Sequence, residues 1–191
     1  MDAANIDLKA FTDTFYKQLC TAGLDPVLET LKYLKHETNV WFEITNLVIP
    51  GHNDGEKEFE AMTRWVMKNL GPDVPMHFSA FHPDYRMMDT PAAGVKTLVK
   101  ARQIAHKNGI HYAYTGNIHD YEGGSTYCSE CGEILIGRDW YQISTWQVNV
   151  GGNYTGNCHC CGAPVSGVFE EMPGQWGRKR QPIRLSSRRS A

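Results

Sequence analysis

Several features that define common protein classes are missing from this chain of 191 residues. It contains no apolar run near the roughly 18 residues needed to cross a membrane, and no basic N-terminal segment followed by an apolar one, as in secretory signals. Its net charge of −2 gives no reason to expect nucleic acid or a membrane as the main partner. Walker A, GxGxxG, GxSxG and HExxH motifs are also absent, so no common catalytic signature applies.

Cysteine, by contrast, is frequent, and four of the 6 cysteines have the spacing of a metal site. The segments YCSECG (127–132) and NCHCCG (157–162) each contain a CxxCG turn. Such a turn aims two thiolates at one point, and its glycine lets the backbone curl beneath them. Two turns complete a tetrahedral four-sulfur site of the kind that suits zinc.

The predicted ligands are Cys128, Cys131, Cys158 and Cys161. Structural zinc is favoured, because four thiolates leave no open position for catalysis. A mononuclear iron site of the same geometry, disulfides and free core cysteines are the alternatives, and the spacer between the turns is somewhat longer than usual. Cys160 is expected to be a spectator. Metal-bound thiolates indicate a reducing compartment, so we expect a cytoplasmic protein.

The first part of the chain alternates between strand-like and helix-like segments. Strands are expected at residues 5–8, 40–49, 75–81 and 111–116, with helices from about residue 25, at 56–70 and from residue 91. This order predicts an α/β fold with a parallel sheet, right-handed crossovers and functional groups at the carboxyl ends of the strands. Periodicity alone leaves open whether the strands form a small open sheet or an arc of a (β/α) barrel.

Composition divides the chain into three regions: residues 1–122, a cysteine-rich zinc-ribbon-like β module at 123–170, and a basic tail at 171–191 that is expected to be flexible. The tail has six basic residues and no acidic residue after Glu171. Together with Trp176 it supports an alternative function, a non-catalytic zinc-ribbon module that binds a protein or RNA. Tails of this composition are more often solvated and disordered.

Polar side chains near strand ends are the candidate binding residues. Asp7 and Lys9 have the period-two spacing that puts both on one face, as a surface ion pair or as groups that bind a ribose hydroxyl and a carboxylate. Glu43 and Thr45 share a face of an otherwise apolar strand, which favours a cavity lining and fits a barrel lumen. His82 follows the third strand and is either an ordinary loop residue or a ligand contact.

Taken together, NIDLKAF (5–11), VWFEITNLVIPGHND (40–54), HFSAFHPDYRM (77–87) and the paired CxxCG turns resemble the radical S-adenosylmethionine (SAM) enzymes. The resemblance extends to about residue 185 and is closest to the pyruvate formate-lyase activating enzyme-like proteins of the AmmeMemoRadiSam-system type. It implies the C-terminal part of a (βα)6 partial TIM-type barrel, followed by the zinc-ribbon-like module.

For the intact enzyme, the resemblance implies reductive cleavage of SAM to methionine and a 5′-deoxyadenosyl radical. This radical would abstract hydrogen from an unknown small-molecule or protein substrate, with glycyl-radical activation as one form of the reaction. Flavodoxin or ferredoxin would be the reductant, and AmmeMemo-system proteins would be partners. The cofactor carries this chemistry, while the protein orients and shields it.

By the same resemblance, Asp7 lies near the SAM ribose, Lys9 near its carboxylate, Thr45 faces SAM and His82 lies against the adenosine. The family holds a [4Fe-4S] cluster on a CxxxCxxC loop, but neither that motif nor the glycine-rich stretch that binds the SAM amino group occurs in this sequence. NIDLKAF would therefore be the fourth strand, and the chain a C-terminal fragment that is inactive alone and begins at an internal or misassigned start. Such a half barrel should expose an apolar lumen face.

Overall fold

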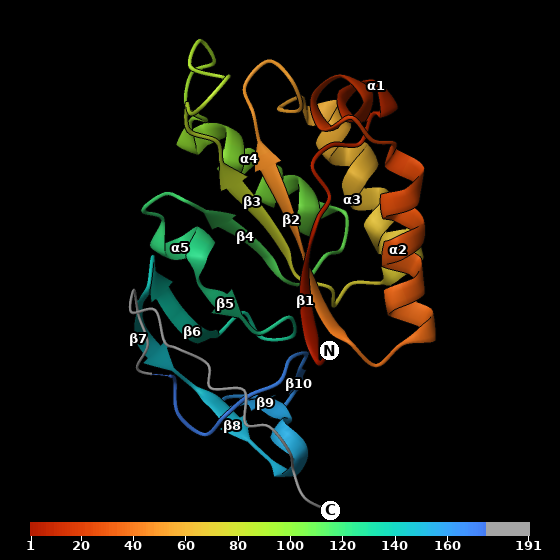
Figure 1. Ribbon diagram of the computed structural model, residues 1–191. Helices are drawn as coiled ribbons and strands as arrows, with labels where there is room; N and C mark the ends of the chain where they lie inside the picture. The colour runs from red at the N-terminus through yellow and green to blue at the C-terminus, as the bar shows by residue number, and fades with distance from the viewer. Residues whose placement is uncertain (175–191) are drawn as a thin grey trace, which may run out of the picture.

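The computed structural model describes residues 1–174 (Figure 1). Its first part consists of β1 (Ala3–Asp7), α1 (Asp13–Phe15), the π-helix η1 (Tyr16–Cys20), α2 (Leu24–Glu37), β2 (Trp41–Val48), α3 (Glu56–Leu70), β3 (Met76–Ala80), α4 (Val95–Lys107) and β4 (Ala113–Gly116). The second part consists of α5 (Tyr121–Gly124), β5 (Thr126–Tyr127), β6 (Ile134–Asp139), β7 (Gln142–Trp146), β8 (Val148–Val150), the 3-10 helix η2 (Gly152–Tyr154), β9 (Gly156–Cys158) and β10 (Pro164–Val165). Most of the basic tail lies outside the described residues, so its flexibility and its role in RNA binding stay predictions.

The first four strands form one parallel sheet in the order β1-β2-β3-β4. The expected alternation of strands and helices is confirmed, although the last long helix begins at Val95 instead of residue 91. The backbone N–H of Ala93 donates to the carbonyl of Phe81 at 2.9 Å, which holds the preceding residues along the end of β3. Helical backbone therefore starts only after Gly94, the N-cap.

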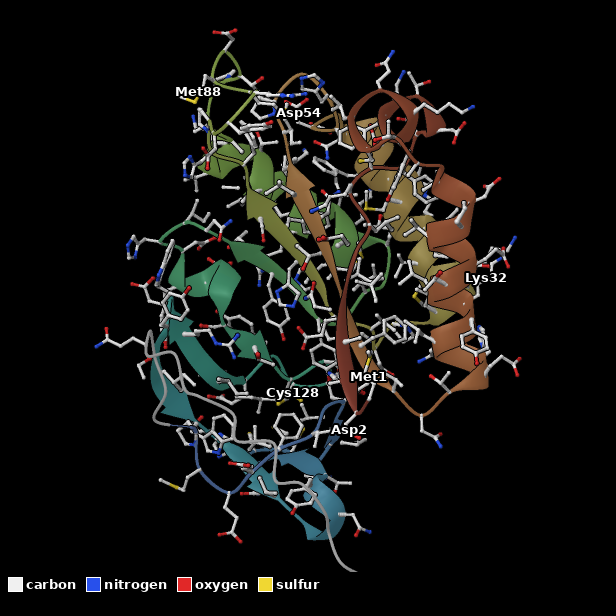
Figure 2. All side chains as sticks on the ribbon, viewed as in Figure 1. Met1, Asp2, Lys32, Asp54, Met88 and Cys128 are labelled. Carbon is white, nitrogen blue, oxygen red and sulfur yellow. The ribbon has the colours of Figure 1, made fainter. Side chains whose placement is uncertain are left out.

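The long helices pack on one face of this sheet, and side chains fill the space between the layers (Figures 1 and 2). Residues of β2 alternate between buried and half-buried, with Phe42, Ile44 and Val48 on the covered face. Phe59 of α3 meets Phe78 of β3 edge-to-face, with ring centroids 5.7 Å apart. Among residues 1–174, no helix is both long and apolar enough to span a bilayer.

The opposite face of the sheet is more polar than expected for the lumen of a half barrel. It carries Asp7, Glu43, Thr45 and His77, none of which is fully buried. Polar residues of β1 to β3 therefore occupy positions that face away from the helices, next to the apolar or aromatic Trp41, Leu47 and Tyr114 of the same face, and a large apolar lumen face stays a prediction. The strand order β1-β2-β3-β4 suits both an arc of a barrel and an open sheet. If β1 were the fourth strand of a (βα)6 barrel, β3 would be the sixth, and β4 would lie one strand beyond the barrel.

The cysteine-rich part contains two small antiparallel sheets, β5-β6-β7 and β8-β9-β10. They share a core that includes Leu135, Val148 and Phe169, and Tyr112, which directly precedes β4, packs into the same core. The tyrosine hydroxyl also accepts a hydrogen bond from the backbone N–H of Ser166 at 3.3 Å. The cysteine-rich part thus packs directly against the parallel sheet, and a division of the chain at residue 122 stays a prediction.

Candidate functional site

The four predicted metal ligands converge in the cysteine-rich part. The sulfur atoms of Cys128, Cys131, Cys158 and Cys161 all lie within 4.8 Å of one another, as a group that could hold a metal ion. Cys128 lies 3.6 Å from Cys161, and Cys131 lies 3.7 Å from Cys158, so the close pairs join the two turns. A tetrahedron with metal–sulfur bonds of about 2.3 Å has sulfur–sulfur edges of roughly 3.8 Å, which these separations approach.

The two cysteine turns have matching backbone geometry, and each sits between two antiparallel strands. Gly132 and Gly162 adopt φ angles of 74° and 75°, which a residue with a Cβ atom adopts only under strain. Their N–H groups donate to the carbonyls of Cys128 and Cys158 at 3.0 and 2.9 Å. Glycine at these positions therefore lets both turns present their sulfur atoms to a common centre.

The four thiols interact with one another electrostatically. A hydrogen bond from the backbone N–H of Cys161 lowers the pKa of Cys158, while burial and hydrogen bonds from neighbouring thiols raise the pKa of Cys131 and of Cys161. Cys158 and Cys128 are buried, while the other two ligands are exposed. Cys160 is exposed and lies outside the group. Zinc and mononuclear iron share such a ligand set, and four thiolates would leave either metal without an open position.

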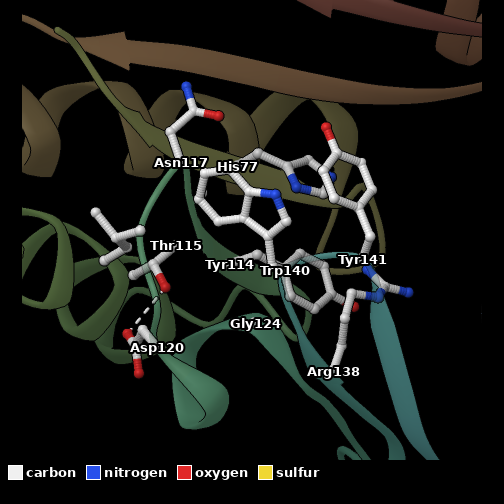
Figure 3. A pocket seen from close by; sticks show the side chains of 11 residues that line it. His77, Tyr114, Thr115, Asn117, Asp120, Gly124, Arg138, Trp140 and Tyr141 are labelled. Carbon is white, nitrogen blue, oxygen red and sulfur yellow. Dashed lines mark hydrogen bonds between the residues drawn. The ribbon is translucent and has the colours of Figure 1, made fainter. Parts of the chain in front are cut away.

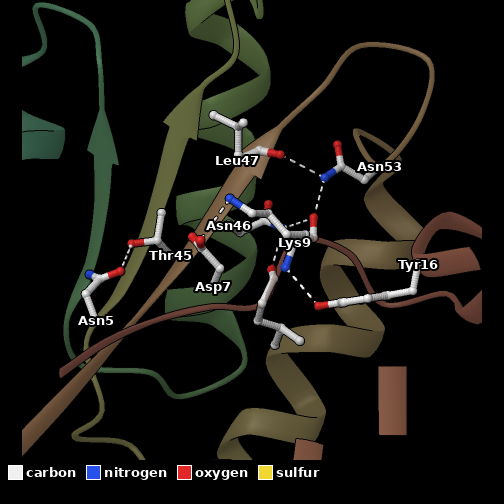
Figure 4. Close-up of polar contacts among 9 residues, drawn as sticks. Asn5, Asp7, Lys9, Tyr16, Thr45, Asn46, Leu47 and Asn53 are labelled. Atoms are coloured by element: carbon white, nitrogen blue, oxygen red, sulfur yellow. Dashed lines mark hydrogen bonds and ion pairs between the residues drawn. The ribbon is translucent and has the colours of Figure 1, made fainter. Parts of the chain in front are cut away.

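Three of the four predicted SAM contacts lie together where β1 ends, with Asp7 and Lys9 at its carboxyl end and Thr45 beside them within β2 (Figure 4). The Lys9 ammonium lies 3.0 Å from the Asp7 carboxylate, with 32% and 53% of the two side chains exposed. Thr45 is opposite Asp7 in the strand register, and its hydroxyl donates to the Asn5 side chain at 2.9 Å. This geometry suits both a partly exposed ion pair and a pair of groups open to a ligand.

His82 is separate from this cluster. It is exposed and lies two residues beyond β3, with Nδ1 2.9 Å from the carbonyl oxygen of Pro83. Within residues 1–174, none of its hydrogen bonds reaches Asp7, Lys9 or Thr45. The structure therefore brings three of the predicted residues together and leaves the histidine on the same sheet edge, two strands from β1.

Two buried asparagines that the sequence did not single out as site residues hold the Lys9 backbone. Asn46 donates to the Lys9 carbonyl at 2.8 Å, and Asn53 donates to the same carbonyl and to that of Leu47 (Figure 4). On the other side, the Lys9 N–H donates to the Tyr16 hydroxyl at 3.0 Å. Both backbone groups of Lys9 are thereby fixed. The available signal was one asparagine within an apolar strand and another shortly after it, because buried amides need hydrogen-bond partners.

A second polar group that the sequence only partly indicated lies on the same face. Glu43 accepts a 2.7 Å hydrogen bond from His77, and this contact lowers the pKa of the carboxyl. The His77 ring stacks on Tyr114 with centroids 5.0 Å apart, and burial raises the pKa of the tyrosine to about 12. Of the two residues predicted to line a cavity, Glu43 lines one of about 240 Å³, whereas Thr45 is not among its lining residues. His77 is half-buried and lines the same cavity.

Comparison with known proteins yields a long relative and a structural neighbour. No protein-family model matches the chain. The uncharacterized protein MJ0808 of Methanocaldococcus jannaschii is 41% identical over 169 residues, which make up 88% of this chain and 49% of that protein. The chain thus spans about half the length of this curated relative.

The structural neighbour is a domain of pyruvate-formate lyase-activating enzyme from Bacteroides vulgatus, known from a crystal structure. The match has a TM-score of 0.53 and covers 61% of this chain and 68% of the other, with 18% sequence identity. At this identity the similarity concerns the fold alone. The chain therefore has a mixed α/β fold, with a parallel four-stranded sheet, similar to that of an activating-enzyme domain.

Proposed function

We propose that this chain supplies the SAM-contacting part of a radical SAM enzyme of the activating-enzyme type. The observation that carries the proposal is the Asp7–Lys9 pair, held at the carboxyl end of β1 by a backbone fixed on both sides. It lies on the polar face of a parallel sheet that resembles an activating-enzyme domain. Ligands of open α/β sheets bind at the carboxyl ends of the strands, which is where this pair is located.

Each side chain at this edge has a role that its chemistry allows. The Asp7 carboxylate would accept hydrogen bonds from the ribose hydroxyls, and the Lys9 ammonium would pair with the SAM carboxylate. The Thr45 hydroxyl would donate its hydrogen bond to SAM instead of to Asn5. His82 would contact the adenosine either after a movement of its loop or because SAM itself spans the distance from Asp7 and Lys9. Because 53% of the Asp7 side chain is exposed, a ligand can reach it without unfolding the strand.

The [4Fe-4S] cluster of the family does not fit the cysteines of this chain. Within residues 1–174 the four converging cysteines come from two CxxC turns and form one closed group, whereas the family's cluster needs three thiolates from a CxxxCxxC loop. In the proposed enzyme the cluster would be held by thiolates of another segment and would supply the electron for SAM cleavage there. The match of this chain to about half of MJ0808 supports such a division.

The four-cysteine group is proposed to hold a structural zinc ion. Its sulfur separations and its closed coordination sphere support that role. The zinc-ribbon-like part would cover the polar sheet face beside β4, or bind a partner such as an AmmeMemo-system protein. The proposed reductant is flavodoxin or ferredoxin.

A titration of SAM into the purified chain, followed by calorimetry, tests the proposal. Lys9→Ala should weaken SAM binding about tenfold or more, because it removes a charge-assisted hydrogen bond to the carboxylate. Lys32→Ala is the matched control, since Lys32 also pairs with a carboxylate, at 2.8 Å from Glu29, and has 39% of its side chain exposed. The proposal is overturned if SAM binding is not saturable or if both variants bind SAM equally well.

A further inference from the structure

A cavity of about 210 Å³ lies between the polar face of the parallel sheet and the turn that joins β6 to β7. His77 and Tyr114 line it from the sheet, while Arg138, Trp140 and Tyr141 line it from the β6–β7 hairpin (Figure 3). The cavity is separate from the Asp7–Lys9 pair and from the cysteines, none of which lines it. Nothing in the proposed SAM contacts accounts for it.

Arg138 provides this cavity with a positive charge that has no ion-pair partner. Within residues 1–174, no carboxylate lies within 4.0 Å of its guanidinium, although the residue is only half-exposed. The acidic lining residue Asp120 is already engaged, because its oxygens accept from Thr115 at 2.9 Å and from the Gly123 N–H at 3.0 Å. Glu43, which lines the neighbouring cavity together with Arg138, is hydrogen-bonded to His77, and the positive charge of Arg138 acts on its carboxylate without an ion-pair contact. A ligand carboxylate would be a suitable partner for the free guanidinium fork.

Trp140 occupies a backbone position that does not favour a bulky residue. It is the first of the two residues between β6 and β7, with a φ angle of 55°. Two-residue hairpin turns need a positive φ at this position and therefore prefer glycine or asparagine. Its indole stacks on His119, with centroids 5.3 Å apart, and is directed to the cavity (Figure 3). Unfavourable backbone conformations of this kind are concentrated at binding sites.

We propose that this cavity binds a small single-ring aromatic carboxylate. Its carboxylate pairs with Arg138, and its ring lies between Trp140 and the stacked pair of His77 and Tyr114. A cavity of about 150 Å³ holds benzene, so 210 Å³ accommodates one ring with a carboxylate. The inference rests on the cavity alone and does not depend on the proposed reaction with SAM.

Calorimetric titration with benzoate, in the absence of SAM, tests the inference. The wild-type chain is expected to bind benzoate saturably, with a dissociation constant below about 10 mM. This value corresponds to a binding free energy of roughly −3 kcal/mol or better, which a ligand of this size can reach. Benzyl alcohol, which lacks the charge, and inorganic phosphate, which lacks the ring, are expected to bind at least tenfold more weakly. Equal binding of either compound overturns the assignment of ligand class.

Two variants test the residues, with one matched control. Arg138→Gln removes the charge and is expected to weaken benzoate binding at least tenfold. Arg64→Gln makes the same change on α3, where the arginine side chain is 70% exposed and pairs with Glu60, and should leave benzoate affinity unchanged. Trp140→Gly replaces the indole at a position where glycine is favoured, so the variant should fold like the wild type and yet bind at least tenfold more weakly. Wild-type affinity in either pocket variant overturns the proposal.

Discussion

At the scale of single residues, Glu43 is the group on the polar sheet face whose protonation should most affect stability. The hydrogen bond from His77 lowers the pKa of its carboxyl below the usual value of 4.5. A group whose pKa is lower in the folded state contributes stability above its unfolded pKa, and this contribution is lost as the pH falls through the folded pKa. The contribution should therefore be complete near neutral pH and disappear in acid below about pH 4.5.

Glu43→Gln should remove this contribution. The unfolding free energy of the wild-type chain, measured by urea denaturation, should fall more steeply between about pH 5 and pH 3 than that of the variant, because only the wild type must protonate Glu43. The difference should be small, since 38% of the Glu43 side chain is exposed and solvent screens the pair. Parallel pH profiles of the two proteins would contradict the account of the Glu43–His77 contact.

Single residues also show what periodicity in a sequence cannot reveal. The shared face of Glu43 and Thr45 follows from alternation, but the partner of each depends on strand register, and His77 becomes visible as a partner only when β2 and β3 are paired. Likewise, no pattern indicates that Arg138 and Tyr114, which are distant in the chain, line one cavity. The cysteines were predictable because two CxxCG turns encode their local geometry within six residues each.

At the scale of secondary-structure elements, Asn53 connects the ends of β1 and β2. It is 1% exposed, accepts from the Ile49 N–H at 2.6 Å, and donates to the carbonyls of Lys9 and Leu47. The Asn53 side chain thus joins the two backbones by hydrogen bonds beyond the point where the backbone pairing of β1 with β2 ends. It also places the Lys9 backbone, so stability and the geometry of the candidate site are connected at this residue.

Asn53→Ala should destabilise the chain by about 2–4 kcal/mol, because it leaves buried backbone groups without hydrogen-bond partners. Asp54→Ala is the control, since its carboxylate accepts from the exposed Gly51 N–H and its loss should cost less than about 1 kcal/mol. Urea denaturation of both variants measures the difference. Equal destabilisation by the two substitutions would mean that the asparagine does not connect the strands as described.

The existence and order of the long elements were predictable, because apolar residues recur at helical or strand spacing over each of them. The range expected for α3, residues 56–70, agrees with the structure. The start of α4 was not predictable, since it depends on a backbone hydrogen bond from Ala93 to Phe81. The short elements α1, η1 and α5 contain 3, 5 and 4 residues, too few to show a period.

At the scale of the whole molecule, the four-cysteine group joins the two small sheets of the cysteine-rich part. One turn lies between β5 and β6, and the other between β9 and β10. A metal ion at this point would therefore cross-link segments that are otherwise held by a small core. Binding of a metal to the folded state alone stabilises that state by mass action.

Metal analysis of the purified chain should give about one zinc ion per molecule, as expected for a single four-thiolate site. Cys128→Ser should lose the metal and lower the thermal midpoint, because one ligand of the closed site is removed. Cys160→Ser should keep both the metal and the midpoint of the wild type, since that cysteine lies outside the group. Loss of metal in the Cys160 variant would show that the ligand set is assigned incorrectly.

The most direct test of the proposed function is the formation of 5′-deoxyadenosine from SAM. The product of the complete open reading frame would be reconstituted with iron and sulfide without oxygen, reduced with dithionite and mixed with SAM. The proposal predicts 5′-deoxyadenosine and methionine in equal amounts, with a yield at least tenfold lower for Lys9→Ala and unchanged for Lys32→Ala. Failure of this protein to bind an iron–sulfur cluster, or a bound cluster without SAM cleavage, would contradict the assignment to radical SAM chemistry.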